Sequence, residues 1–306
     1  MAERFLNHQV KVTGFSPKPS QSSTFGAYIS DEAPAIEVED LRVQFTVEKN
    51  LSSEPNTCEI TITNLATHTR TFFQQKPFHV VLEAGYVDSP LRHLFRGDVR
   101  WGQSQLIEGD WETMLQLGDG DRMFRHARVS RSFKGGVSLR DALREVSKVM
   151  GVELPRSNSL DSAMNNQYAS GLALAGAASS ALTELLSPYG FEWSIQSGKL
   201  VILRPDEIQA GRATVINENG GMIGSPQFGP PEKPSAKRTR KPRKDGRNPD
   251  LPTVTVRMLL FPELSPGTQI ELQSKAISGT FKATRVTHSG DTHGQEWVTE
   301  VEATPL

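Results

Sequence analysis

The stretch "LRVQFTVEKNLSSEPNTCEITITNL" (residues 41–65) contains two runs in which apolar and polar residues alternate, separated by a turn rich in Ser, Pro and Asn. A period of two places alternate side chains on opposite faces of a β-strand, so each run predicts a strand with one buried and one wet face. The residues expected on the buried face are Leu41, Val43, Phe45, Val47, Cys58, Ile60 and Ile62.

Residues 78–86, 94–101 and 111–119 repeat this style, with Gly, Pro, Asn and Asp between the runs. Strands at such regular spacing are typical of an antiparallel barrel or sandwich. We therefore predict a first antiparallel β-barrel domain over residues 1–125.

The pattern then changes to that of a small α+β domain, which we place at 126–205. Ser138 is a good N-cap, with Asp141 as its reciprocal partner, and Gly151 suits the position after the helix ends. A second helix is expected within residues 172–190. Residues 191–203 predict a hairpin that turns at Ser197-Gly198.

The alternation of apolar and polar residues returns in the last third of the chain. Four strands are expected, in 253–261, 267–273, 279–288 and 296–303. Residues 206–306 are predicted to form a second β-barrel domain. The fold class is thus mainly β, with two antiparallel β-barrel domains flanking a two-helix plus hairpin insert.

The candidate metal-binding or catalytic residues are His288, Asp291 and His293. Two histidines and a carboxylate are ligands that zinc accepts, so a zinc-dependent hydrolase is one hypothesis. The connecting "SGDTHGQ" (289–295) is also what a hairpin turn requires, with Asp291 and Ser289 bonding the turn backbone and Trp297 packing at the start of the last strand. We favour the hairpin, and expect no metal, cofactor or catalytic residue.

Composition further narrows the class of protein to which the chain can belong. The single cysteine, Cys58, excludes an internal disulfide framework and is expected to be a small buried residue. The start "MAERFLNHQV" lacks the apolar core of a signal peptide, and no stretch has the length of a membrane span, so we expect a soluble, unsecreted protein.

A Pro-rich basic loop at 230–250 concentrates positive charge. Residues 231–250 hold eight of the 34 basic residues and three of the 35 acidic residues. The rest of the chain therefore carries 26 basic and 32 acidic residues. Such a segment cannot bury a core, so it is either a solvated loop or an arm that docks on an acidic partner. Nucleic-acid binding through 233–247 is a third hypothesis, weakened by the lack of aromatic residues for base stacking. The candidate partner contacts are Lys237, Arg238, Arg240, Lys241, Arg243 and Lys244.

Several segments in order resemble the baseplate and tail hub proteins of bacteriophages, the family of late control protein D. They are residues 39–65, "FEWSIQSGKLVIL" (191–203), "MIGSPQ" (222–227), residues 256–272 and, most specifically, "RVTHSGDTHGQEWVTEVEA" (285–303). The basic loop departs from the family, in which this connection is much shorter.

The resemblance implies a structural virion protein rather than an enzyme, in which the two antiparallel β-barrel domains are similar to those of a tail tube. It implies a homotrimer that acts as a symmetry adaptor between the hexameric tail tube and a trimeric spike or tip, touches other baseplate proteins, and leaves a lumen for DNA passage without specific nucleic-acid binding. It also implies a place at the tail tip or baseplate of the virion, after assembly in the host cytoplasm. The alternative is a zinc-dependent cell-wall hydrolase of the tail tip.

Overall fold

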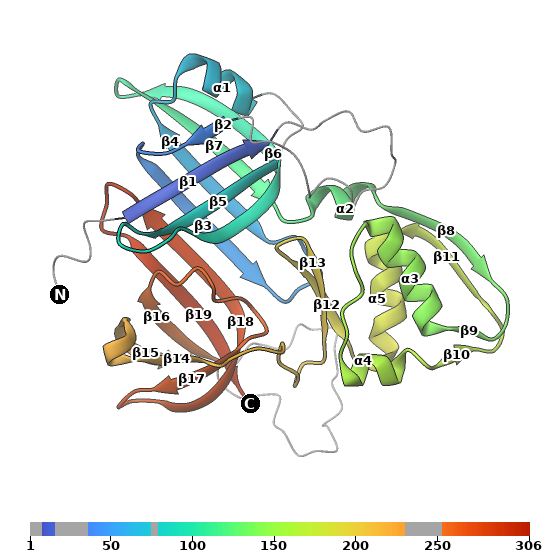
Figure 1. Ribbon diagram of the computed structural model, residues 1–306. Coiled ribbons are helices and arrows are strands. Elements are labelled where there is room, and N and C mark those ends of the chain that lie inside the picture. Colours follow the sequence, from blue (N-terminus) through green and yellow to red (C-terminus); the bar gives the residue numbers. More distant parts are fainter. Residues whose placement is uncertain (1–7, 16–35, 75–78, 230–252) are drawn as a thin grey trace.

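The computed structural model describes residues 8–15, 36–74, 79–229 and 253–306 (Figure 1). The protein is mainly β: strands from both ends of the chain make one large, mostly antiparallel sheet, and a smaller α+β region lies beside it. Three clusters of buried apolar side chains correspond to the N-terminal strands, the α+β region and the C-terminal strands.

The N-terminal β region confirms the alternation of residues 41–65. Val43, Phe45 and Val47 are buried, and the polar residues between them are more exposed. Hydrogen bonding orders its strands β3-β4-β7-β6-β5-β1-β2. The elements are β1 (His8–Phe15), β2 (Ile36–Val38), β3 (Val43–Asn50), β4 (Thr57–Thr63), α1 (Thr67–Gln74), β5 (His79–Tyr86), β6 (Arg92–Ile107) and β7 (Asp110–Gly118).

The C-terminal β region contains the four expected strands and two more. Its order is β15-β16-β19-β18, with β17 beside β18 and β14 parallel to β17. The elements are β14 (Thr214–Asn217), the 3-10 turn η4 (Glu218–Gly220), β15 (Met222–Phe228), β16 (Val254–Leu259), β17 (Gln269–Gln273), β18 (Ser278–Asp291) and β19 (Trp297–Pro305).

The two β regions are joined, because β3 pairs antiparallel with β18 over Gln44–Asn50 and Arg285–Asp291. We call this pairing the β3–β18 seam. The sequence predicted two β-barrel domains, and the seam places strands of both β regions in one sheet. Leu260 and Trp297 even belong to the buried cluster of the N-terminal region. Closure of each region into a barrel stays a prediction.

The α+β region contains the predicted helix and hairpin. Ser138 Oγ accepts a hydrogen bond from the backbone N–H of Asp141, and Gly151 follows the helix with a φ of 72°. The hairpin turns at Ser197 and Gly198, which have φ values of 52° and 76°. The elements are α2 (Asp121–His126), β8 (Arg128–Phe133), β9 (Val137–Ser138), α3 (Leu139–Met150), α4 (Asn158–Ala163), β10 (Gln167–Tyr168), β11 (Leu172–Ala177), α5 (Ala178–Leu186), η3 (Ser187–Tyr189), β12 (Glu192–Gln196) and β13 (Lys199–Leu203).

One helix prediction is correct only for the second half of its range. The helix expected within 172–190 begins only at Ala178, because residues 172–177 form β11 and pair with β8. Gly176 has a φ of 118°, a conformation outside a right-handed helix. The strand gives β8 a partner along its length, and this tertiary pairing outweighs the helix propensity of the alanines.

Candidate functional site

His288 is a buried residue of β18. Its side chain is 0% exposed, and Nδ1 lies 2.9 Å from the Thr299 hydroxyl on β19. Burial, reinforced by the positive charge of Lys49, lowers the pKa of His288 well below its usual value. The imidazole is therefore neutral at neutral pH and acts as a packed core residue.

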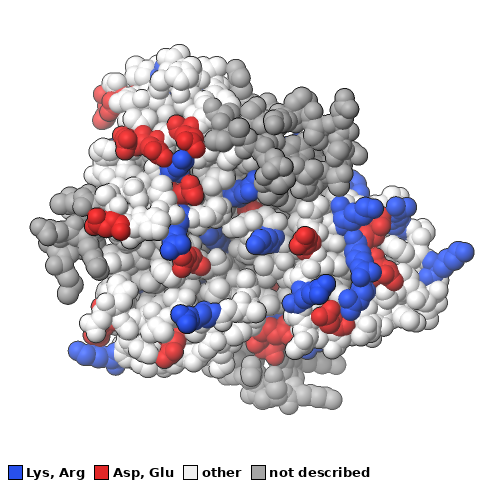
Figure 2. Space-filling view, viewed as in Figure 1, with Lys and Arg blue, Asp and Glu red and all other residues white. Residues whose placement is uncertain are grey.

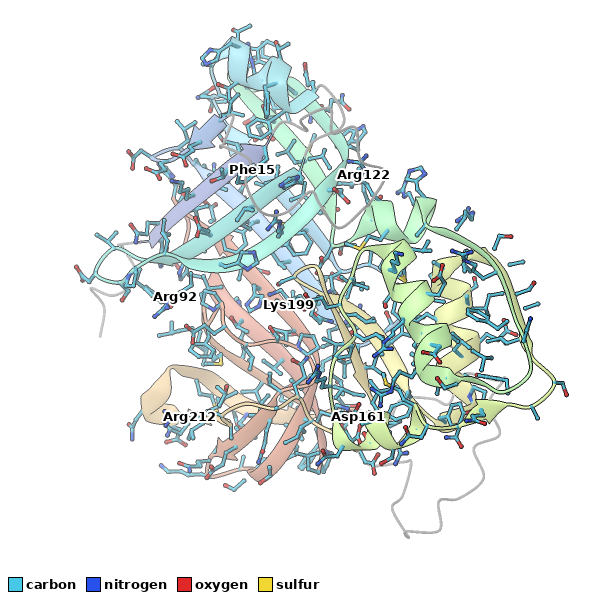
Figure 3. All side chains as sticks on the ribbon, turned by 45° about the vertical axis from the view of Figure 1, so that its right-hand side comes forward. Phe15, Arg92, Arg122, Asp161, Lys199 and Arg212 are labelled. Atoms are coloured by element: carbon cyan, nitrogen blue, oxygen red, sulfur yellow. The ribbon has the colours of Figure 1, made fainter. Side chains whose placement is uncertain are left out.

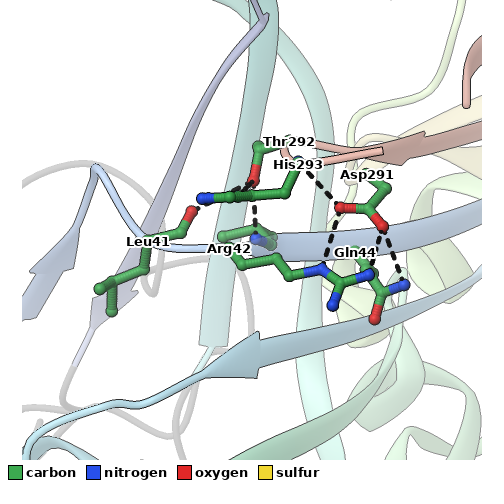
Figure 4. Close-up of polar contacts among 7 residues, drawn as sticks. Leu41, Arg42, Gln44, Asp291, Thr292 and His293 are labelled. Carbon is green, nitrogen blue, oxygen red and sulfur yellow. Dashed lines mark hydrogen bonds and ion pairs between the residues drawn. The ribbon is translucent and has the colours of Figure 1, made fainter. Parts of the chain in front are cut away.

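Asp291, the last residue of β18, is bonded to β3 across the seam (Figure 4). Arg42 donates to it twice, from Nε to Oδ1 at 3.3 Å and from Nη2 to Oδ2 at 2.8 Å, and Gln44 Nε2 adds a bond of 3.1 Å. Partial burial would raise the pKa of Asp291, but hydrogen bonds from Arg42 and from the His293 backbone lower it below its usual value. The carboxylate stays ionised, and both of its oxygens accept hydrogen bonds.

Thr292 completes this contact. Its backbone N–H donates to the Val43 carbonyl at 3.1 Å, and its hydroxyl accepts from the Val43 N–H at 3.0 Å (Figure 4). We call Arg42, Gln44, Asp291 and Thr292 the seam clamp. Its bonds tie the turn that follows β18 to the start of β3.

The hairpin interpretation of residues 285–297 agrees with this geometry. The Asp291 carboxylate accepts a bond from the His293 N–H at 2.9 Å, as expected for a turn, although no side-chain hydrogen bond of Ser289 is found among the described residues. The strand continues to Asp291 rather than ending at His288. His288 faces the core and Asp291 is engaged by Arg42, whereas His293 is exposed. No three His, Cys, Asp or Glu residues within the described ranges are grouped so that they could hold a metal ion.

Trp297 packs at the start of β19, as predicted, and it links three strands. Its ring stacks on His8 of β1, with centroids 4.2 Å apart, and meets the edge of Phe45 at 5.4 Å. Gly290 lies beneath these rings, where an added Cβ would be 2.5 Å from Phe45. The aromatic cluster thus buries the seam from the core side.

A second junction, between the N-terminal β region and the α+β region, was not predicted. The Asp119 carboxylate accepts bonds from the backbone N–H groups of Ser197 (2.5 Å) and Gly198 (2.9 Å) at the hairpin tip. Asn56 Nδ2 donates to the Ile195 carbonyl and to Gln196 Oε1, both at 2.9 Å. We call these six residues the hairpin junction.

Two buried ionisable residues, Asp119 and Lys49, interact at the hairpin junction. Burial raises the pKa of Asp119 to about 7, although the two N–H bonds and Lys49 oppose the change. Burial lowers the pKa of Lys49 to about 8, against the attraction of Asp119. The period of two that predicted Val43, Phe45 and Val47 as buried also places Lys49 inward, and this signal could have identified it.

Cys58 is buried, as predicted, and burial raises the pKa of its thiol. The six candidate contacts of the basic loop, Lys237, Arg238, Arg240, Lys241, Arg243 and Lys244, lie outside the described residues. Their role stays a prediction. No helix in the described part of the chain combines the length and apolar character needed to span a membrane.

Comparison with known proteins agrees with the resemblance to phage baseplate and tail hub proteins. The family model described as "Baseplate hub gp41" matches residues 26–229. No curated protein sequence matches the chain.

Solved structures share the fold at low sequence identity. A tail protein from Neisseria meningitidis MC58 is 10% identical with a TM-score of 0.63, over 97% of this chain and 96% of that one. The 43 kDa tail protein of prophage MuSo2 from Shewanella oneidensis is 8% identical with a TM-score of 0.62, over 97% of both chains. An Escherichia coli component of the type VI secretion system, described as similar to T4 tail proteins gp27 and gp5, is 13% identical with a TM-score of 0.54, over 87% of this chain and 74% of that one.

Proposed function

Because the chain belongs to the baseplate hub gp41 family of phage tail proteins, we propose that it forms a homotrimeric hub at the tail tip or baseplate of the virion. The hub acts as a symmetry adaptor: it docks on the hexameric tail tube at one end and on a trimeric spike or tip at the other. Other baseplate proteins surround it, and assembly takes place in the host cytoplasm. The role is structural and involves no catalysis.

The β3–β18 seam is the observation that carries this proposal. Three chains with two β regions each supply six β regions, which is the number a hexameric tube presents. Such a ring needs the two β regions of a chain to be held in a fixed relation, and heterologous contacts between chains that close after three copies. A continuous sheet with the seam clamp across it supplies that rigid relation.

The charge of the body is compatible with a lumen through which DNA passes. Outside residues 231–250 the chain carries 26 basic and 32 acidic residues, so it has a small negative excess. A wall without excess positive charge would not retain the phosphate backbone.

The mass of the assembled protein tests the proposal. The chain has a mass of 33.7 kDa, and light scattering on the purified full-length protein should give three times that value. Imaging of the particle should find three copies between tube and tip. A stable monomer or dimer in solution, together with a tail that lacks the protein at that junction, would refute the hub.

The basic loop is proposed to contact an acidic face of an adjacent baseplate or tube protein. Replacing Lys237, Arg238, Arg240, Lys241, Arg243 and Lys244 with Ser or Gln should impair tail assembly. Normal, infectious particles from that variant would contradict this contact. If the purified chain retains DNA in a salt-sensitive manner that these replacements abolish, the loop is instead a nucleic-acid contact.

A further inference from the structure

Helix α3 carries a line of basic side chains. Arg140, Arg144 and Lys148 are four residues apart, so they lie on one face of the helix. Arg156 follows in the segment that leads to α4. These four line a depression of about 330 Å³, which we call the α3 groove; buried Met164 contributes to its wall.

Glu153 and Asp161 also line the α3 groove, so the positive charge of its four cations is partly neutralised. Arg140 pairs with Asp161 at 3.4 Å, and Arg144 with Asp141 at 3.7 Å. Among the described residues, Lys148 and Arg156 form no ion pair. Figure 3 shows Asp161 in the α+β region, and Figure 2 shows basic side chains gathered over that part of the surface, with acidic ones between them.

The α+β region also differs in charge from the rest of the chain. Residues 126–205 contain nine basic and six acidic residues, whereas the remainder outside 231–250 contains 17 basic and 26 acidic residues. The α3 groove is thus a local attractor for anions on a body that otherwise carries excess negative charge.

We infer that the α3 groove binds an extended, acidic peptide segment of a partner protein. Successive cations four residues apart on a helix are about 6 Å apart along its axis. Every second residue of an extended peptide is about 6.6 Å from the last and lies on the same face. A segment with Asp or Glu at alternate positions therefore places its carboxylates in step with Arg140, Arg144 and Lys148.

The groove favours a peptide over a nucleic acid. Apolar side chains of Val152, Leu154, Pro155 and Met164 line it beside the cations and suit the aliphatic parts of a peptide. Double-stranded DNA is bound through many phosphate contacts along the duplex, whereas the α3 groove offers four cations in one depression. This inference is independent of the trimeric hub, because it concerns a surface of the single chain.

A fluorescence anisotropy titration tests it with a labelled peptide of about ten residues that has glutamate at alternate positions, in step with the helix. The protein is the full chain with the six cations of 237–244 changed to Gln, so that the basic loop does not bind the probe. Lys148→Glu with Arg156→Glu should weaken binding by about tenfold or more. Lys148→Gln with Arg156→Gln should give a smaller loss in the same direction.

The matched control removes the same charge elsewhere. Lys134→Glu with Arg212→Glu reverses two exposed cations outside the groove and should change affinity by less than about twofold. An equal loss in the control, or equal binding of a probe with glutamine in place of glutamate, would overturn the inference. So would a short DNA duplex that binds more tightly than the peptide and is released by Lys148→Glu with Arg156→Glu, because the groove would then be a nucleic-acid site.

Discussion

Arg42 and Asp291 are 249 residues apart in the sequence, yet bonds of 2.8 and 3.3 Å join their charged groups across the β3–β18 seam. Asp291 lies opposite Gln44 in the register of the two strands. A slip by one residue would exchange the faces of every side chain on β18. The ion pair therefore favours the one register that keeps His288 and Val286 in the core.

Removing the clamp carboxylate should weaken the protein. Asp291→Ala is expected to lower the free energy of unfolding by about 1–3 kcal/mol, because the bonds of Arg42, Gln44 and the His293 N–H lose their acceptor. Urea denaturation measures this change. Arg285→Ala is the control: its pair with Glu302 spans 3.7 Å at the surface, and its loss should cost less than about 1 kcal/mol. Equal effects would show that the clamp adds nothing beyond a surface pair.

Adding one carbon under the aromatic cluster should also destabilise the fold. The Cβ of Gly290→Ala would lie 2.5 Å from the Phe45 ring and 2.7 Å from Trp297. Overpacking of this kind costs about 1–3 kcal/mol. Gly211→Ala, where an added Cβ meets no atom within 4 Å, should leave the thermal midpoint nearly unchanged. A Gly290→Ala protein as stable as the wild type would exclude this tight packing.

Loss of Asn56 should loosen the α+β region more than it unfolds the sheet. Asn56→Ala leaves the buried Gln196 side chain and Ile195 carbonyl without their donor, a cost of about 1–3 kcal/mol. Hydrogen exchange should rise at the Ser197–Gly198 tip before it rises in β3. Asn165→Ala, an exposed position, is the control. Unchanged protection at the tip would mean that the junction does not hold the hairpin.

Acid should destabilise the protein through His288. Its folded-state pKa lies well below the ordinary value of 6.5, so below pH 6.5 the unfolded chain binds a proton that the folded one does not. The contribution is fully present above that pH and is lost as the pH falls. Between pH 7 and 5 the wild type should lose about 2 kcal/mol more than His288→Gln. His126→Gln, at an exposed site, should follow the wild type; if His288→Gln does so as well, the burial argument fails.

Chelation should have no effect on the described fold. His288 is fully buried in the core and Asp291 bonds Arg42, so neither side chain is available to zinc. The thermal midpoint should be the same with and without EDTA, and His293→Ala should match the wild type. Stoichiometric zinc in the purified protein, lost in His293→Ala, would restore the hydrolase hypothesis.

Local patterns predicted β3–β7, β12, β13 and β16–β19, the Ser138 cap and the Ser197–Gly198 turn, because each depends on neighbours in the chain. They failed at β11, where pairing with β8 decides the structure, and at the β3–β18 seam, which joins strands more than 200 residues apart. The clamp residue Asp291 was predicted to bond its own turn, but its partner Arg42 could not be inferred without the register. The hairpin junction was missed for the same reason: Asn56 and Gln196 meet only through tertiary packing.

The seam also has a consequence for biosynthesis. β3 cannot complete its pairing, and Phe45 cannot be covered by Trp297, until residues 285–305 have left the ribosome. A contact of such high sequence separation makes folding slow and prevents the N-terminal strands from finishing co-translationally. A nascent chain that stops before β18 would expose the unpaired edge of β3, which is a template for aggregation. Only full-length translation products would then reach an assembling particle in native form.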